Sequence, residues 1–204
     1  MKYDVLEVGQ YGTNCYILYS RDDTQALLID PAFEVERIDA AVGGRAVPYV
    51  ILTHCHVDHV CMCGYFRDKY GAKICIGEDD CDGLRRQQIY RPIPIALEYG
   101  AVDIRPDVLL SDGDTVSFGG YELHILSTPG HTAGGISIYC PQGLLFSGDT
   151  VFRASYGRTD FPGGNRSKLM SSIRRLMALP ADTIVLPGHG PCTTVGAERA
   201  AYGL

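Results

Sequence analysis

The chain has 204 residues and a mass of 22.2 kDa, a length that fits one domain and can bury a core without disulfide bonds. Its 46% hydrophobic and 21% charged residues are typical of an ordinary globular protein and argue against disorder. The formal net charge is −6 and basic residues form no run longer than a pair, so nucleic acid and anionic membrane surfaces are not expected as partners.

Apolar runs rich in β-branched residues, separated by turn signals, predict nine strands. In chain order they are residues 3–8, 14–20, 26–30, 49–54, 73–77, 121–131, 136–140, 144–149 and 183–189. Apolar residues at helical spacing predict four helices, at Glu34–Val42, Cys63–Tyr70, Asp79–Gln88 and Arg166–Ala178. This alternation predicts a mixed α/β (α+β) fold. The stretch Tyr90–Asp107 contains three prolines and is predicted to be an irregular loop, and loops of that length often act as lids or binding flaps.

The sequence also bears on the cellular compartment. The first ten residues, MKYDVLEVGQ, contain no apolar stretch of signal-peptide length, and no run of 18 apolar residues follows, so we expect a cytoplasmic protein. The eight cysteines are then interpreted as reduced thiols, mostly small buried hydrophobic side chains. For Cys55, Cys61 and Cys63, which lie near a histidine cluster, a thiolate ligand or a redox-sensitive thiol is the alternative.

That cluster is the hexapeptide His54–His59, with the sequence HCHVDH. Imidazole nitrogens and carboxylate oxygens are typical ligands of zinc and similar metals. Neither core packing nor a solvated surface requires three histidines and an aspartate within six residues. The hexapeptide therefore predicts a metal site.

Other potential ligands stand where predicted strands run into turns. They are His131, Asp149 and His189, and His54 itself occupies the same kind of position. A single histidine or aspartate beside glycine is more often a turn or packing residue, but side chains on loops at one sheet edge can converge in space. We therefore interpret the set as one site. The sixth histidine, His124, alternates within its strand and is interpreted as a surface or structural residue.

Four motifs in this order, THCHVDH, STPGHT, SGDTVF and PGHGP, resemble those of the metallo-β-lactamase superfamily, with Asp30 in LLIDPA as a further marker. Within it, the chain is most similar to the compact glyoxalase II-like (hydroxyacylglutathione hydrolase-like) branch, which hydrolyses thioesters. The resemblance implies a four-layer αββα sandwich with a binuclear site at one edge. It also implies a single domain over residues 1–204 that lacks the helical glutathione-binding domain of full glyoxalase II, because fifteen residues follow His189.

The resemblance also assigns the metal ligands. One metal is held by His54, His56 and His131, the second by Asp58, His59 and His189, and Asp149 bridges the two. The implied cofactors are two divalent ions, zinc first, with iron or manganese as alternatives. Such ions lower the pKa of bound water to about 7. A metal-bridging hydroxide would attack a thioester or ester carbonyl, with Asp58 as the catalytic residue that orients the attack.

The chain departs from the family pattern at positions that concern the substrate. Asp149 stands where β-lactamases of the commonest zinc class carry cysteine, so antibiotic hydrolysis is not expected. The segment Val60–Met62 replaces a hydrophobic residue followed by two glycines, and its bulk is expected to alter the pocket. Arg158 either contacts a substrate carboxylate or pairs with Asp160 and braces its loop. The expected partner is a small-molecule thioester such as an S-lactoyl-glutathione-like compound.

Other functions are weighed against the hydrolase. The segment Gly157–Phe161, GRTDF, resembles persulfide dioxygenases of the same superfamily, which hold a single iron with two histidines and an aspartate. Those enzymes have glutamines where Pro162 and Gly163 stand, and they lack the PGHGP arrangement. A non-catalytic metal-binding protein would not account for seven ligands. The superfamily's nucleases carry clamp domains for which an acidic chain of this length has no room.

Overall fold

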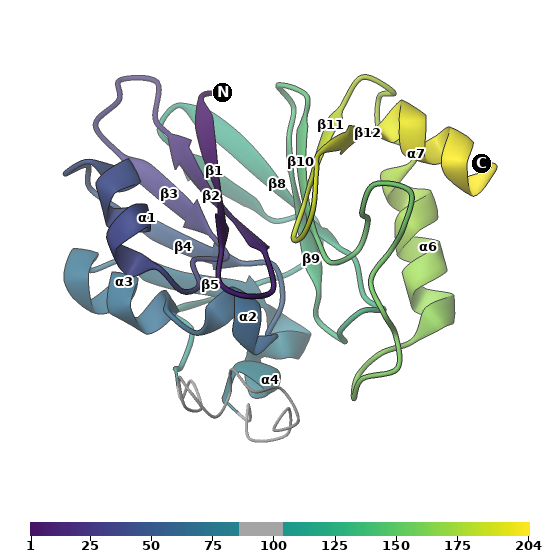
Figure 1. The fold of residues 1–204 in the computed structure, drawn as a ribbon, viewed down its shortest axis with the longest axis horizontal. Coiled ribbons are helices and arrows are strands. Elements are labelled where there is room, and N and C mark those ends of the chain that lie inside the picture. The colour runs from purple at the N-terminus through teal and green to yellow at the C-terminus, as the bar shows by residue number, and fades with distance from the viewer. Residues whose placement is uncertain (86–103) are drawn as a thin grey trace.

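In a computed structural model, which describes residues 1–85 and 104–204, the chain forms two β-sheets of six strands each (Figure 1). The strand order is β1-β2-β3-β4-β5-β6 in the first sheet and β12-β11-β10-β9-β8-β7 in the second. Most of the predicted loop Tyr90–Asp107 and the end of the predicted helix Asp79–Gln88 lie outside the described residues.

The first sheet contains β1 Tyr3–Val8, β2 Thr13–Tyr19, β3 Ala26–Ile29, β4 Tyr49–Leu52, β5 Lys73–Gly77 and β6 Val108–Leu110. The second contains β7 Thr115–Phe118, β8 Tyr121–Ser127, β9 Ile136–Cys140, β10 Leu144–Gly148, β11 Ile184–Pro187 and β12 Thr193–Thr194. The helices are α1 Val35–Val42, α2 Val57–Val60, α3 Cys63–Tyr70, α4 Cys81–Arg85, α6 Arg166–Leu176 and α7 Val195–Tyr202, with a 3₁₀ turn, η1, at Glu78–Asp80.

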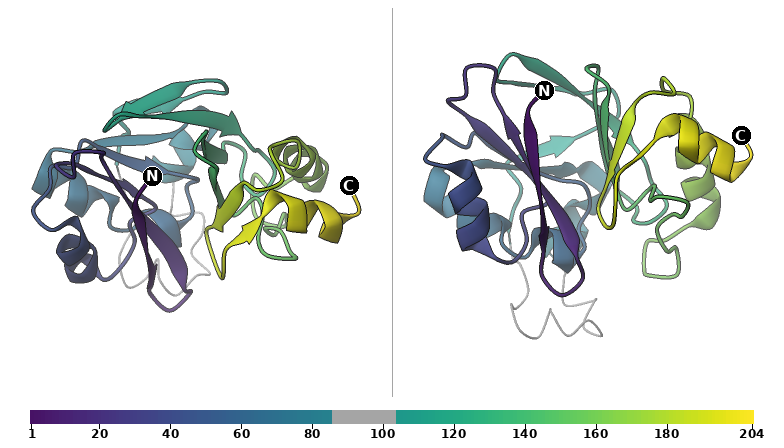
Figure 2. Two further views of the ribbon diagram at one scale, coloured as in Figure 1. Left: turned by 90° about the horizontal axis from the view of Figure 1, so that it is seen from above. Right: turned by 45° about the horizontal axis from the view of Figure 1, so that its top comes forward.

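The layers follow the order helix, sheet, sheet, helix. Figures 1 and 2 show α1 and α3 outside the first sheet and α6 and α7 outside the second. Successive side chains of a strand point to opposite faces. In β2, Ile17 therefore packs in the cluster that includes α1 and α3, whereas Tyr16 and Leu18 pack against the second sheet. Because both faces are covered, β2 is buried along its whole length and carries a continuous apolar run. The predicted αββα sandwich is confirmed.

Strand direction brings the loops of the potential ligands to one edge. Both β8 and β10 are antiparallel to β9, and β11 is parallel to β10, so the carboxyl ends of β8, β10 and β11 meet. The end of β4 joins them from the first sheet, because the carbonyl of Thr53 accepts the N–H of Ile136 at 2.9 Å. Both sheets thus contribute loops to the same place.

All nine predicted strands are present, but six of them end before the predicted residue, and β4, β8 and β11 end two or more residues early. His124 lies in β8, half-buried, with its Nδ1 3.1 Å from Thr115 Oγ1, as expected for a structural residue. Not predicted were β6, β7, β12, α2 and α7. Among the described residues, no helix is both long enough and apolar enough to cross a membrane.

Candidate metal centre

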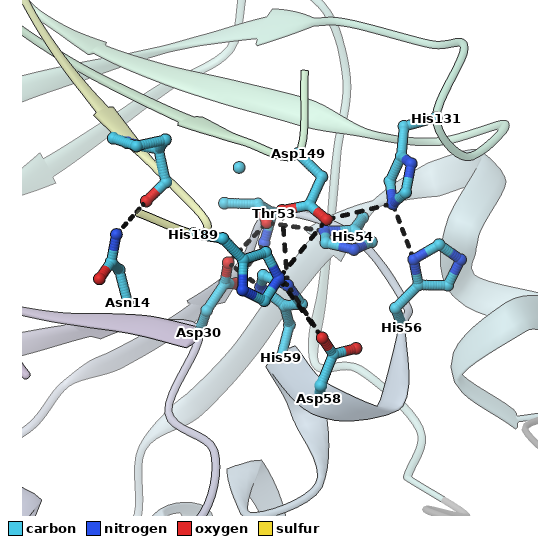
Figure 3. A network of polar contacts seen from close by, with 12 residues as sticks. Asn14, Asp30, Thr53, His54, His56, Asp58, His59, His131, Asp149 and His189 are labelled. Carbon is cyan, nitrogen blue, oxygen red and sulfur yellow. Dashed lines mark hydrogen bonds and ion pairs between the residues drawn. The ribbon is translucent and has the colours of Figure 1, made fainter. Parts of the chain in front are cut away.

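All seven predicted ligands lie together at this edge (Figure 3). His54 follows β4, while His56 is the N-cap of α2, the four-residue helix that carries Asp58 and His59. The other three follow strands of the second sheet: His131 after β8, Asp149 after β10 and His189 after β11. Each of the two sheets therefore supplies part of the site.

The first group of ligands consists of three buried imidazoles, those of His54, His56 and His131. Each offers a nitrogen, and these nitrogens lie within 4.8 Å of one another, with His131 Nε2 2.8 Å from His56 Nδ1. The Nε2 atom of His54 is buried and has no hydrogen-bond partner among the described residues. Buried polar atoms are normally satisfied, so this arrangement fits a metal ion that the three nitrogens would hold.

The second group consists of Asp58, His59 and His189, whose ligand atoms also lie within 4.8 Å of one another. His59 Nε2 is 3.1 Å from His189 Nε2, and Asp58 Oδ2 is 3.4 Å from His189 Nε2. These nitrogen and oxygen atoms are again suitable ligands for a divalent metal.

The carboxylate of Asp149 lies between the two groups (Figure 3). Its Oδ2 is 3.4 Å from His131 Nε2 in the first group, and its Oδ1 is 3.5 Å from His59 Nε2 in the second. The Oδ2 atom is also 3.7 Å from His189 Nε2 of the second group. One carboxylate therefore reaches both groups, as a bridging ligand must.

Backbone and side-chain partners fix the orientation of the rings. His131 Nδ1 donates to the carbonyl of Arg158 at 2.7 Å, and His189 Nδ1 donates to the carbonyl of Tyr11 at 3.0 Å. Because a carbonyl oxygen only accepts, both rings carry hydrogen on Nδ1 and present Nε2 to the site. Such partners hold a metal-binding imidazole in its productive orientation.

Asp30, the further marker in the sequence, orients His59 from the outside. Its Oδ2 is 2.9 Å from His59 Nδ1, while it accepts the backbone N–H of Thr53 at 2.7 Å and the Thr53 hydroxyl at 2.6 Å. Asp30, His54 and His59 also lie close enough to form a third candidate group. Because both oxygens of Asp30 are already engaged by Thr53 and His59, we interpret Asp30 as a support and not as a ligand.

The two groups differ electrostatically. Burial, together with repulsion among the imidazoles, holds the pKa of His54 well below its usual value, and burial lowers the pKa of His56 to about 3. Both rings are therefore neutral at physiological pH, the form that binds metals. Burial also lowers the pKa of His59, but three neighbouring aspartates outweigh it and raise the pKa to about 10. In the metal-free protein, protons on the second group thus compensate the carboxylates.

The family model described as the metallo-beta-lactamase superfamily matches residues 8–189. The chain belongs to this superfamily. It is 37% identical over 199 residues to a protein of Aquifex aeolicus, covering 96% of this chain and 93% of the other. It is 33% identical over 204 residues to the probable metallo-hydrolase YqgX of Bacillus subtilis. It is 32% identical over 210 residues to the hydroxyacylglutathione hydrolase GloC of Haemophilus influenzae. Both alignments cover 98% of this chain and 95% of the relative.

Solved structures of the superfamily share the fold over nearly the whole chain. The BLEG-1 B3 metallo-beta-lactamase superposes with a TM-score of 0.90 at 30% identity, covering 98% of this chain and 97% of that one. TTHA1623 in a di-iron-bound form gives 0.81 at 30% identity, with 97% and 98% covered. ETHE1 from Myxococcus xanthus gives 0.80 at 29% identity, with 98% and 82% covered.

Two sequence expectations concerned residues beside the superfamily's metal motif. Val60 is fully buried in the core under α1 and α3. Cys61 and Met62 are half-buried and pack against the same core. Burial raises the pKa of both Cys61 and Cys63 to about 12, which disfavours a thiolate. No cysteine belongs to a candidate metal group in the part of the chain that the structure describes.

Arg158 forms the pair that the sequence offered as one of two readings. Its guanidinium donates to both carboxylate oxygens of Asp160, at 2.7 and 2.6 Å, and it stacks 3.9 Å from the ring centre of Phe161. Phe161 in turn lies edge-on to His56, with ring centres 5.7 Å apart. The pair is exposed to solvent and stands beside the first group of ligands.

Sequence reasoning missed several residues around the superfamily's ligands. Asn14 and Tyr16 on β2 contact the turn that carries His189, and Asp80 contacts the loops of the first group. Glu198 on α7 accepts the N–H of Ala154 at 2.9 Å and so anchors the loop that leads to Arg158. None of them belongs to a local motif, and their partners are distant in sequence.

Proposed function

We propose that the protein is a hydrolase that holds two divalent metal ions and cleaves a thioester, such as an S-lactoyl-glutathione-like compound. The observation that carries this proposal is the position of Asp149, whose two oxygens lie 3.4 and 3.5 Å from imidazole nitrogens of different ligand groups. A single-metal site would use one ligand group and would leave the imidazoles and carboxylates of the other group without a role.

The residues divide the task as follows. His54, His56 and His131 would hold one ion, Asp58, His59 and His189 the other, and Asp149 both. When bound, such ions supply Lewis acidity and lower the pKa of water toward neutrality.

Asp58 is proposed as the catalytic residue. Interactions with His59 and His189 outweigh the effect of burial and keep its carboxyl pKa below the usual range. It is therefore ionised and can accept a hydrogen bond from a water molecule, which orients that water for attack on a carbonyl carbon. The carbon–sulfur bond then breaks. Of the two protons of the attacking water, one goes to the departing thiolate and the other to solvent, so the products are a carboxylate and a thiol.

The choice of a thioester rests on the relatives. GloC, a hydroxyacylglutathione hydrolase by name, matches nearly the whole chain at 32% identity, and YqgX is named a probable metallo-hydrolase. Zinc is the proposed metal, and the di-iron form of TTHA1623 supports iron as the alternative. A cytoplasmic location and a single functional domain over residues 1–204 form part of the same proposal.

The decisive experiment combines metal analysis with a substrate panel. We expect two metal ions per chain and release of free thiol from S-lactoyl-glutathione and related thioesters. His56→Ala and Asp149→Asn remove a ligand and should lose metal and activity, whereas His124→Ala, outside the site, is the matched control. Equal activity in all four proteins would overturn the proposal. Because BLEG-1 is named a metallo-beta-lactamase, the panel includes a β-lactam, and β-lactam cleavage without thioester cleavage would replace the proposed substrate class.

A persulfide dioxygenase is the second candidate, favoured by the segment Gly157–Phe161 and by the likeness to ETHE1. That reaction needs one iron and molecular oxygen. It is tested by measuring oxygen uptake with glutathione persulfide on the iron-loaded protein. One iron per chain together with persulfide-dependent uptake would establish it in place of the hydrolase.

A further inference from the structure

We propose that two buried side chains outside the ligand set, Asp80 and Asn14, are positioning residues, each for one half of the metal centre. Asp80 would set the first ligand group and Asn14 the second. The inference rests on the proposed function, since it assumes that both groups bind a metal ion. It concerns how the two sheets are held at the distance that the ligands require.

Asp80 joins two loops that carry ligands of the first group. It lies in η1 at the end of β5 and is 2% exposed. One oxygen accepts the N–H of Cys55 at 3.0 Å, between His54 and His56. The other accepts the N–H of Gly134 at 2.6 Å, in the loop that follows His131. One carboxylate thus ties the loop after β4 to the loop after β8 in the opposite sheet.

The surroundings of Asp80 show that this contact is specific. The described residues form no ion pair with Asp80, and burial raises its pKa. Burying an unpaired carboxylate is costly, so its hydrogen bonds must compensate. The loops approach closely, because a Cβ atom on Gly134 would lie 2.2 Å from the backbone nitrogen of Asp80. The position of His131 relative to His54 and His56 therefore depends on this short connection.

Asn14 brackets His189 in the second group. It lies on β2 and is 5% exposed. Its side-chain amide donates to the carbonyl of Pro187 at 2.9 Å and to that of Gly190 at 2.8 Å, on the two sides of His189. Its backbone N–H donates to the carbonyl of Gly188 at 2.8 Å. The first sheet thus holds the turn that presents His189 Nε2.

Asp80 contacts loops that carry ligands of the first group, and Asn14 contacts the turn that carries a ligand of the second group. Each variant is therefore a control for the other. Asp80→Asn keeps the shape of the side chain but turns an amide N–H₂ toward one of two backbone donors. Asn14→Asp keeps its shape and turns a carboxylate toward two carbonyl oxygens. Partners that orient metal ligands typically contribute about 10- to 100-fold in metal affinity. We expect Asp80→Asn to lower by that factor the affinity of the first ligand group for its ion. Asn14→Asp should lower the affinity of the second group in the same way.

The experiment reads each histidine separately. The protein contains 6 histidines, so the full chain labelled with ¹⁵N-histidine gives few imidazole signals, and a bound metal shifts the nitrogen that holds it. The signals are followed at a series of buffered zinc concentrations, and bound zinc is measured by mass spectrometry. Circular dichroism of the metal-free proteins checks folding. Asp39→Asn is the stability control, because Asp39 accepts hydrogen bonds from Tyr65 and Tyr70 far from the metal loops.

We expect each variant to weaken zinc binding by one ligand group and to leave the other group unchanged. In Asp80→Asn, the signals of the first group reach their zinc-bound positions only at 10-fold or more higher free zinc, while those of His59 and His189 titrate as in the wild type. In Asn14→Asp the pattern is reversed, and Asp39→Asn changes neither. Equal weakening of both groups in each variant, or no weakening in a folded variant, overturns the inference. A variant that does not fold is replaced by the serine variant, whose smaller hydroxyl can both donate and accept a hydrogen bond.

Failure of the proposed function gives a different result. If the wild-type protein binds a single ion and the signals of one group never shift, the binuclear hydrolase is wrong. If the wild type binds two ions and cleaves thioesters but the variants show no selectivity, the positioning roles alone are wrong.

Discussion

Gly188 stands in the turn before His189, and its lack of a side chain leaves room for the bridging carboxylate. A Cβ atom added at this position would lie 2.2 Å from Asp149 Oδ1 and 2.8 Å from His59 Cε1. Non-bonded atoms settle about 3.5 Å apart, so Gly188→Ala must move the carboxylate of Asp149 by about 1 Å. A displacement of that size at a reacting centre can cost about 100-fold in rate.

We therefore expect Gly188→Ala to lose about 100-fold in kcat/KM for thioester cleavage and to bind fewer than two ions at limiting zinc. Gly190→Ala is the control, because an added Cβ there meets nothing within 4 Å but the residue has a φ of +72°. It strains the same turn by about 1 kcal/mol without touching Asp149. Thiol release, bound metal and thermal unfolding are measured for both variants. Equal losses of activity and metal in the two would refute the reasoning, because strain in the turn would then explain them.

Four further predictions rest on the pKa of His59 and on the contacts of Glu198 and Arg158. Zinc binding at pH 8 should release protons, because the metal-free protein holds the pKa of His59 at about 10, above its usual 6.5. Metal affinity should therefore fall as the pH is lowered. A binding enthalpy that does not depend on the ionisation enthalpy of the buffer would contradict this. In the absence of metal, the same proton should stabilise the fold most below about pH 6.5, with the contribution lost as the pH rises through 10. Glu198→Ala should lower the free energy of unfolding by about 1–3 kcal/mol, because it removes the partly buried hydrogen bond to Ala154. An unchanged urea midpoint would show that this hydrogen bond is not needed. Arg158→Ala should leave KM and the unfolding temperature nearly unchanged, because the ion pair of Arg158 with Asp160 is exposed and exposed ion pairs stabilise little. A tenfold increase in KM would instead assign the guanidinium to substrate binding.

The strands and the metal ligands could be predicted from sequence where a local pattern of residues marks them. The strands before His54, Asp149 and His189 are mostly apolar runs, so their positions are visible without the structure, although each ends one or two residues earlier than predicted. The short helix α2 was not predicted, because four residues are too few for a periodic pattern and its N-cap, His56, is not a typical capping residue. Similarly, β6 and β12 contain three and two residues.

The supporting residues could not be found in the same way, because their importance arises from contacts between distant segments. Asn14 and Pro187 are separated by 173 positions, and Asp80 and Gly134 by 54. In the sequence Asn14 is one polar residue at the start of an apolar strand, and Asp80 is one of two adjacent aspartates. Only the packing of the two sheets shows that Asn14 reaches the turn of His189 and that Asp80 reaches the loop of His131.

Each proposed ion would take ligands from both halves of the chain: His54 and His56 with His131, and Asp58 and His59 with His189. The ions would then act as reversible cross-links between the N-terminal and C-terminal sheets. A ligand that binds only the folded state stabilises that state in proportion to its free concentration. Zinc supply would therefore set the lifetime of the folded chain against proteolysis as well as its activity.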